Sequence, residues 1–317
     1  MIDRGRLQKR SRPNAPPQTN RPARTSRFGA CRPTTPLPPR PGSAIGDQNT
    51  RARHSPLEDI LSTATLILVL AAFLAGFIDA IAGGGGLITV PALLLAGVPP
   101  VESLGTNKLQ SLFGSASATI AYSKKGHVDL KKQWRWAVYS FVGACAGALL
   151  ATVMPGIVLA TLLPVLLILI ALYFAFKPDL NDVDRAERMR PALFGVLLVP
   201  LIGFYDGLFG PGTGSFFMLA FVALAGFGVL KATAHTKLLN FASNLGGFVV
   251  FALMGVVHWK IGLLMGVAQF AGARVGAGLA MKNGAKLIRP LLVLVCIALA
   301  VRLLMDADHP IRALIGY

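Results

Sequence analysis

The chain has few charged residues and few cysteines, and each shortage excludes a class of protein. Asp, Glu, Lys and Arg make up 14% of the 317 residues, while 54% are hydrophobic. Soluble domains carry about 25% charged residues, so this composition indicates an all-α, polytopic membrane protein. The three cysteines, Cys31, Cys145 and Cys296, fit neither a disulfide framework nor a zinc site.

The sequence also lacks the motifs that an enzyme inside a membrane would need. It contains no HExxH motif, no paired-cysteine cluster and no Ser–His pairing at a usable spacing. His127 and His258 are expected in short loops, without enough converging ligands to hold a metal ion. We therefore predict no catalytic residue, no metal site and no cofactor, and keep a membrane-embedded enzyme only as an alternative.

The first 58 residues differ in composition from the rest of the chain. Residues 1–58 hold 12 Lys and Arg but only 3 Asp and Glu, among many Pro, Ser and Thr. Such a segment cannot bury enough apolar surface to fold, and it has no apolar stretch resembling a signal peptide. It is interpreted either as a cytoplasmic arm that contacts anionic lipid head groups or as an extension from a start codon assigned too early.

Ten apolar segments follow the tail, and two of them are too short to cross a membrane. The short segments, 86–97 and 214–226, each follow a glycine cluster and would cover roughly 18 Å, less than the hydrocarbon thickness. We expect broken helices or re-entrant hairpins there, which are tolerated only against protein or a water-filled cavity. The other eight approach or exceed a full span: 62–82, 103–123, 134–153, 156–176, 191–209, 230–255, 259–281 and 286–304.

The apolar region contains one pattern twice. The segment GFIDAIAGGG (76–85) reappears as GFYDGLFGPG (203–212), and TNKL (106–109) as HTKL (235–238). Each half then has an acid, a glycine cluster and a lysine in matching places, which is typical of a transporter made of two repeats. The predicted organisation is a disordered tail (1–58), repeat 1 (59–176), a charged loop (177–190), repeat 2 (191–305) and a short C-terminal tail (306–317).

Two topologies follow from the short segments. If they do not cross, eight spans give parallel halves and an internal amino terminus, but Lys282, Lys286 and Arg289 fall outside, against the positive-inside rule. If they cross, the halves are inverted, all basic loops fall inside, and the basic tail falls outside, against the positive-inside rule. We prefer eight spans with a cytoplasmic tail; if the tail is an artefact, the inverted arrangement becomes the better one.

The duplicated G-F-x-D-x-x-x-G-x-G element resembles the TauE/SafE family of membrane permeases, often called sulfite exporters. Pro91, the Thr/Asn/Lys element and the turn GHVD (126–129) extend the resemblance over about residues 62–305. It implies a multi-pass transporter of the cell membrane for small anions, typically sulfite, sulfoacetate and other organosulfonates. A homodimer is expected by analogy only. This chain departs from the family in its tail and in having His258 where repeat 1 has Asp129.

Asp79 and Asp206 are predicted to lie deep in the first helix of each half. A charged carboxylate there costs at least ~2.5 kcal/mol unless it is paired, protonated or hydrated. One interpretation is proton coupling by a buried carboxyl group. The other is a structural cap that accepts hydrogen bonds from the amides of the following glycine loop.

Two glycine clusters precede the short segments, and they allow two interpretations. Without Cβ atoms the backbone can approach a ligand closely and form an anion-binding nest at a helix start. Small residues also favour tight helix packing in membranes. The candidate substrate-binding residues are Gly83, Gly84, Gly85, Gly210, Gly212 and Thr213.

Lys108 and Lys237 begin long apolar segments at matched positions, beside Asn107 and His235. Each ammonium group either faces a cavity and attracts an anion, or extends to the lipid head groups. Asn240 and Asn244, four residues apart, share a helix face and are further candidates to bind the substrate or to join helices.

Arg274 lies in the middle of segment 259–281 and should face a partner or a cavity. Asp206 and a substrate anion are its candidate partners.

These features predict a permease that moves small sulfur-containing anions across a lipid bilayer by alternating access. Asp79 and Asp206 are the candidate proton carriers. A channel, a transporter of carboxylates and a scaffold acting through the basic tail are the alternatives. No nucleic-acid partner is expected.

Overall fold

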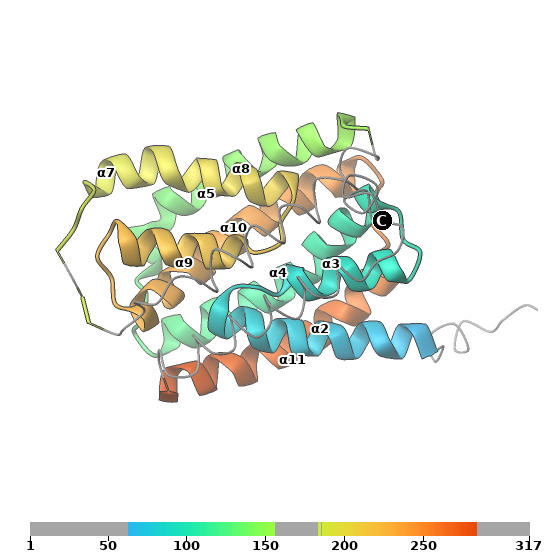
Figure 1. Ribbon diagram of the computed structural model, residues 1–317, viewed down its shortest axis with the longest axis horizontal. Coiled ribbons are helices and arrows are strands. Elements are labelled where there is room, and N and C mark those ends of the chain that lie inside the picture. The colour runs from blue at the N-terminus through green and yellow to red at the C-terminus, as the bar shows by residue number, and fades with distance from the viewer. Residues whose placement is uncertain (1–62, 156–182, 185, 284–317) are drawn as a thin grey trace, which may run out of the picture. The chain divides into compact units, whose positions relative to one another are not determined.

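The computed structural model describes residues 63–155, 183–184 and 186–283, and every regular element within these ranges is a helix. This confirms the all-α class. The predicted segments 156–176 and 286–304, and the tail 1–58, lie outside the described residues. The helices are shown in Figure 1 and are α2 (Thr63–Ala82), α3 (Gly86–Leu95), α4 (Pro100–Lys124), α5 (Leu130–Val153), α7 (Pro191–Leu193), η1 (Phe194–Leu198), α8 (Val199–Leu208), α9 (Thr213–Ala223), α10 (Val229–Leu253) and α11 (Trp259–Asn283).

Five of the described helical stretches are long and apolar enough to cross a membrane. They are α2, α5, α10, α11 and the continuous stretch Pro191–Leu208 formed by α7, η1 and α8. The two predicted short segments are helices of 10 and 11 residues, α3 and α9, and at ~1.5 Å per residue neither spans a bilayer. The chain is therefore a multi-pass membrane protein with two incomplete helices.

Each short helix turns back from the helix before it and forms a hairpin. The tip of the α2–α3 hairpin contains Gly83, with φ +83°, and the tip of the α8–α9 hairpin contains Gly210 and Gly212, with φ +87° and +82°. Side chains are strained at such positive φ values, so glycine is needed where the chain reverses. This is one physical reason for the two glycine clusters.

The bundle has two ends, which we name the Thr63 end and the Pro191 end. At the Thr63 end, Thr65 of α2 lines a pocket together with the start of α11, and His258 contacts Glu102 in the first turn of α4. At the Pro191 end, the backbone N–H of Met189 donates to the carbonyl of Leu224, which follows α9.

The starts of α5 and α10 also meet at the Pro191 end. The side chain of Gln133 there donates to the carbonyl of His235 over 2.9 Å. Hairpin α2–α3 therefore begins and ends at the Thr63 end, while hairpin α8–α9 begins and ends at the Pro191 end, as Figure 1 shows.

The opposed hairpins correct the preference for parallel halves. That prediction counted the first segment of each half as a crossing in its own right. In the structure this segment and its short partner return together to the end from which they started. The corresponding helices of the two halves consequently run in opposite directions, as in the inverted alternative, although the short helices do not cross as that alternative required.

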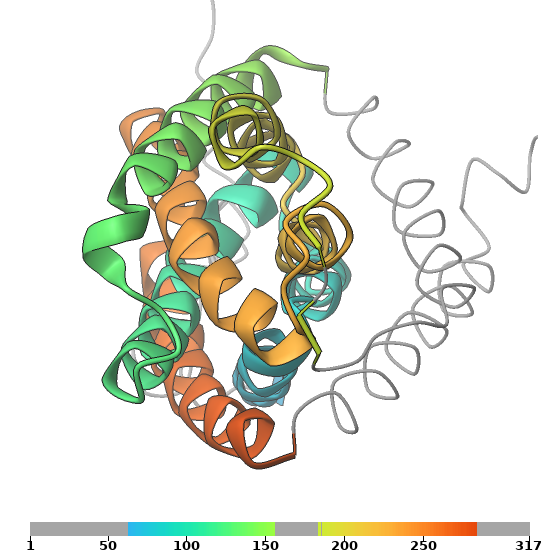
Figure 2. The same ribbon diagram turned by 90° about the vertical axis from the view of Figure 1, so that its left-hand side faces the viewer.

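Helices α4 and α10 lie at the centre of the described bundle (Figure 2). Helix α11 packs on α2 and α4, and α5 packs on α8 and α10. Glycines permit the closest approaches: a Cβ on Gly272 would lie 2.0 Å from the carbonyl oxygen of Phe73, and one on Gly147 would lie 2.0 Å from that of Phe204. The outer helices thus clamp two central helices that carry most of the buried polar side chains.

Candidate functional site

The tips of the two hairpins touch each other inside the bundle. Ser215 at the start of α9 donates its backbone N–H to the carbonyl of Gly83 over 3.1 Å and its hydroxyl to that of Ala82 over 2.7 Å. A Cβ on Gly83 would lie 2.3 Å from the carbonyl carbon of Gly214. Close packing therefore accounts for part of the glycine requirement, as the second interpretation of the clusters supposed.

A small cavity lies where the two tips meet α4 and α10. Its volume is about 10 Å³ on a scale where one water needs about 10–15 Å³. An anion with three oxygens does not fit unless the tips move apart. The lining residues are Asp79, Gly83, Gly86, Asn107, Ser111, Asp206, Gly210, Gly212, Thr213, Gly214, Asn240 and Asn244.

Both short helices begin at this cavity. Gly86 is the first residue of α3 and Thr213 is the first residue of α9, and both line the cavity. The first N–H groups of a helix have no partner within the helix, and the helix dipole adds partial positive charge at that end. A small anion in an enlarged cavity would therefore meet two positive helix ends.

Lys108 forms a buried ion pair with the acid of the other hairpin. Its Nζ lies 2.7 Å from Oδ1 of Asp206, and both side chains are at most 2% exposed. The lysine stem passes over Gly247 of α10, where a Cβ would lie 3.1 Å from it, and Nζ lies equally close to the Cβ position of Gly210. The ammonium group is thus held at the hairpin tip and does not extend to the lipid head groups.

Lys237 makes the corresponding contact with Asp79, but the details differ. Its Nζ lies 3.5 Å from Oδ2 of Asp79 and also donates to the main-chain carbonyl oxygen of Asp79. Oδ1 of Asp79 accepts the N–H of Gly85 over 3.3 Å, which matches the cap interpretation. Each acid is therefore paired with the lysine of the opposite half.

The two acids differ in how fully their oxygens are bound. Both carboxylate oxygens of Asp79 have a donor, whereas Oδ2 of Asp206 is buried and has no hydrogen-bond partner. Asp206 is among the residues that line the cavity. A buried carboxylate oxygen without a partner is costly, which marks the position as one that a proton or a ligand group would stabilise.

Amide and hydroxyl groups complete the lining. Oδ1 of Asn107 accepts hydrogen bonds from Thr89 and Gln110, at 2.6 and 3.0 Å. The Asn244 amide donates to the carbonyl of Asn240 over 2.7 Å. Sequence reasoning missed Ser111, although its place one helical turn after Asn107 put it on the same face of α4.

Two predicted site residues lie away from the cavity. The ring of His235 packs near Phe221 and Phe227, and its Nδ1 lies 2.9 Å from Oε1 of Gln133. Arg274 is exposed on α11, and Asp206 pairs with Lys108 instead of Arg274.

The helix face of Arg274 explains its exposure. Gly272 and Gly276 turn inward, since a Cβ on either would lie within about 2.2 Å of a carbonyl oxygen of α2. Position 274 is half a turn from both, so it points away from α2. Gly84 and Gly85 belong to the tip but do not line the cavity, and Lys108 and Lys237 are not among its lining residues although their partners Asp206 and Asp79 are.

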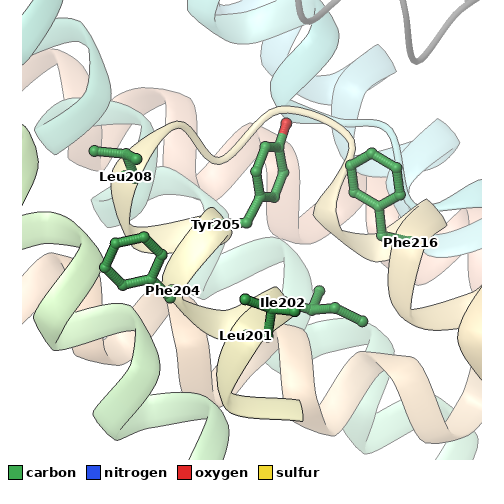
Figure 3. A pocket seen from close by; sticks show the side chains of 6 residues that line it. All are labelled: Leu201, Ile202, Phe204, Tyr205, Leu208 and Phe216. Carbon is green, nitrogen blue, oxygen red and sulfur yellow. The ribbon is translucent and has the colours of Figure 1, made fainter. Parts of the chain in front are cut away.

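A second hollow lies on α8 and α9 and differs in chemistry from the cavity. Its volume is about 190 Å³. Figure 3 shows the side chains that line it: Leu201, Ile202, Phe204, Tyr205, Leu208 and Phe216. Its one polar side chain, Tyr205, donates its hydroxyl to the carbonyl of Pro211 over 2.6 Å. The hollow offers no charge to an anion, so the cavity between the tips is the candidate site.

Comparison with known proteins identifies the family. The family model described as "Sulfite exporter TauE/SafE" matches residues 68–303. A probable membrane transporter protein of a Sinorhizobium species is 62% identical over 82% of this chain and all of its own length. The probable membrane transporter protein YfcA of Escherichia coli is 49% identical over 76% of this chain and 90% of its own. No solved structure matches the chain.

Proposed function

Since the chain belongs to the TauE/SafE family of membrane transporters, we propose that it is a secondary transporter of small sulfur-containing anions such as sulfite or sulfoacetate. The observation that supports this most is the convergence of two helix N-termini on one cavity, whose two lining carboxylates, Asp79 and Asp206, are each paired with a buried lysine. An anion is recognised by such positive helix ends and ammonium groups. The cavity is placed between two inverted hairpins, where many transporters bind their substrate.

Transport by alternating access follows from the opposed hairpins. Withdrawal of the α2–α3 tip from Ser215 would open a path from the cavity toward the Thr63 end. Withdrawal of the α8–α9 tip would open one toward the Pro191 end. Because the tips close the cavity to about 10 Å³ by direct hydrogen bonds, the occluded state favours a carrier over a continuously open channel.

The distribution of basic residues supports one orientation in the membrane. At the Thr63 end Lys260 starts α11, beside the pair of Glu102 and His258. The Pro191 end carries Lys124, Lys125, Lys131, Lys132, Arg135, Arg188, Arg190, Lys231 and Lys282. By the positive-inside rule we place the Pro191 end in the cytoplasm.

Labelling with a membrane-impermeant thiol reagent would test the orientation. A cysteine at Gly255, in the turn before α11, should react in intact cells, and one at Gly126 should react only after the cells are opened. Both glycines have positive φ and open space around them, so the two sites are matched. The opposite labelling pattern would place the Pro191 end outside.

Uptake into proteoliposomes would test the transport function. Labelled sulfite and sulfoacetate should accumulate saturably in a wild-type preparation when a pH gradient is imposed, and Lys108→Ala should abolish that uptake. Loss of the buried Lys108–Asp206 pair removes a positive group beside the cavity. Uptake of neither anion by folded protein would remove sulfur anions as substrates and direct the search to carboxylates. Flux that does not saturate would favour a channel.

A further inference from the structure

We propose that Asp206, and not Asp79, carries the coupling proton, and that one proton enters with each monoanion and transfers Lys108 from Asp206 to the anion. This inference rests on the proposed transport function and assigns the proton within its site. Three features of the occluded cavity carry it: its net charge, the unequal bonding of the two acids, and the groups that surround Asp206.

The first feature is the charge balance of the site. Asp79 and Asp206 contribute two negative charges, and Lys108 and Lys237, which pair with them, contribute two positive charges. A monoanion added to this neutral set would leave one negative charge uncompensated in a space that holds about one water. Burying an unpaired charge is costly, and one proton restores neutrality.

The second feature decides which acid receives the proton. On Asp79, Oδ1 accepts the N–H of Gly85 and Oδ2 faces the ammonium of Lys237. A proton there would displace a donor and release the tip of the α2–α3 hairpin. On Asp206, Oδ2 has no partner and the residue lines the cavity. A proton binds this oxygen without displacing any donor.

The third feature is that no other charged or titratable group on the described helices donates a hydrogen bond to Oδ2 of Asp206. From α4 the facing charged group is Lys108, which lies on Oδ1. Across the cavity α2 presents Asp79, and α10 presents Lys237, which is bound to Asp79. From α5, Cys145 lies 3.5 Å from the carbonyl of Gly246.

The remaining elements around Asp206 also offer no titratable group that is available to its Oδ2. On α8 itself, Tyr205 donates to the carbonyl of Pro211. Helix α9 has no titratable residue between Thr213 and Ala223. Among the described residues that line the cavity, Asp206 is therefore the acid with a carboxylate oxygen that has no hydrogen-bond donor.

The step is a proton transfer and an exchange of ion partners. A proton from water forms an O–H bond at Oδ2 of Asp206 when one hairpin has moved away. Lys108 keeps its three protons and shifts one N–H from Oδ1 of Asp206 to an oxygen of the anion. No group is oxidised or reduced. Release of the anion on the other side returns Lys108 to Asp206 and frees the proton.

Proton uptake on binding tests the inference. Purified protein in weakly buffered detergent solution is mixed with sulfite at mildly acidic pH, where sulfite is a singly charged anion, and a pH indicator counts the protons bound. Wild type should take up about one proton per bound anion. Asp184→Asn, which removes the carboxylate of the exposed Lys231 pair outside the cavity, is the control and should behave like wild type. Asp206→Asn should bind the anion without proton uptake, since Lys108 no longer has an anionic partner.

Asp206→Glu keeps a carboxyl group and should keep the proton uptake, which separates a titration role from a structural one. If Asp206→Asn does not fold, wild type and Asp206→Glu still decide the matter: an infrared carboxylic-acid band should appear when wild type binds sulfite, and Asp206→Glu should shift it. Anion binding without proton uptake by wild type, or an infrared carboxylic-acid band on sulfite binding that Asp206→Glu leaves unshifted, would overturn the inference.

Exchange of labelled sulfite between the two sides of proteoliposomes at equal pH distinguishes failure of the proposed transport function from failure of the Asp206 assignment. Absence of exchange refutes the proposed transport function itself. Exchange together with anion binding that takes up no proton refutes only the assignment to Asp206.

Discussion

Removing one partner of the buried Lys108–Asp206 pair should destabilise the protein strongly. At 2.7 Å the attraction between the two charges is about 6 kcal/mol at an effective dielectric constant of about 20. Most of this offsets the cost of taking both ions out of water. A single replacement leaves the other charge buried without a partner, so Lys108→Met should cost about 3–5 kcal/mol.

The chain contains a matched control for this experiment. Lys231 and Asp184 have the same residue types and the same 2.7 Å separation, but their side chains are 45% and 55% exposed. Exposed pairs contribute little, so Lys231→Met should cost less than about 1 kcal/mol. The double variant Lys108→Met with Asp206→Asn should recover much of the loss, because no unpaired ion remains.

The free energy of unfolding in mixed detergent micelles would be measured for wild type, both single variants and the double variant of the buried pair. Equal losses for Lys108→Met and Lys231→Met would refute the reasoning, because burial is the one property in which these pairs differ greatly. A double variant no more stable than Lys108→Met would also contradict it.

Three further predictions concern the tips, the inter-repeat loop and the cavity. Gly83→Ala should abolish folding or transport, because its Cβ would lie 2.3 Å from the carbonyl carbon of Gly214. Gly97 is the control, since it also has φ +83° but nothing lies within 4 Å of its Cβ position. Gly97→Ala should lower the free energy of unfolding by only about 1–2 kcal/mol. The hydrogen bond from the Lys231 ammonium and then the Gly228 N–H lower the pKa of Asp184 below 3.8. The stability that Asp184 contributes to the loop should therefore be full above pH 3.8 and lost as the pH falls through the lowered pKa. Hydrogen exchange at residues 183–190 should speed up over that pH range in wild type and should not change with pH in this way in Asp184→Asn. Asn240→Ala should raise the half-saturating sulfite concentration about tenfold or more in uptake assays without changing stability greatly, and an unchanged value would exclude Asn240 from the substrate site.

The sequence predicted the parts of the site better than their connections. The shortness of α3 and α9 followed from counting apolar residues between Gly and Pro, and the glycine clusters marked the reversals. The cross-pairing of Lys108 with Asp206 did not follow, because matched positions within each half do not indicate how the halves face each other. That relation depends on the direction of the hairpins, which residue counts left open between two topologies.

Arg274 shows a different limit of sequence reasoning. A lone arginine in an apolar segment suggests a buried partner, yet the face it occupies depends on which neighbours pack inward. Gly272 and Gly276 take the inward face against α2, so Arg274 is placed outside. His235 was selected for its position beside Lys237, but it lies on the aromatic cluster near the Pro191 end.

The cavity between the tips is the centre of the account, and access to it from both sides is the most direct test. Ser111→Cys would be placed in a variant without Cys31, Cys145 and Cys296 that still transports. Ser117→Cys is the control, since Ser117 is on the same helix but bonds to the carbonyl of Phe270 outside the cavity.

An impermeant thiol reagent should label Ser111→Cys from either face of the membrane, and saturating sulfite should protect it, while Ser117→Cys stays unlabelled. Labelling of Ser111→Cys from one face only, or labelling that sulfite does not change, would contradict an alternating-access site at this cavity.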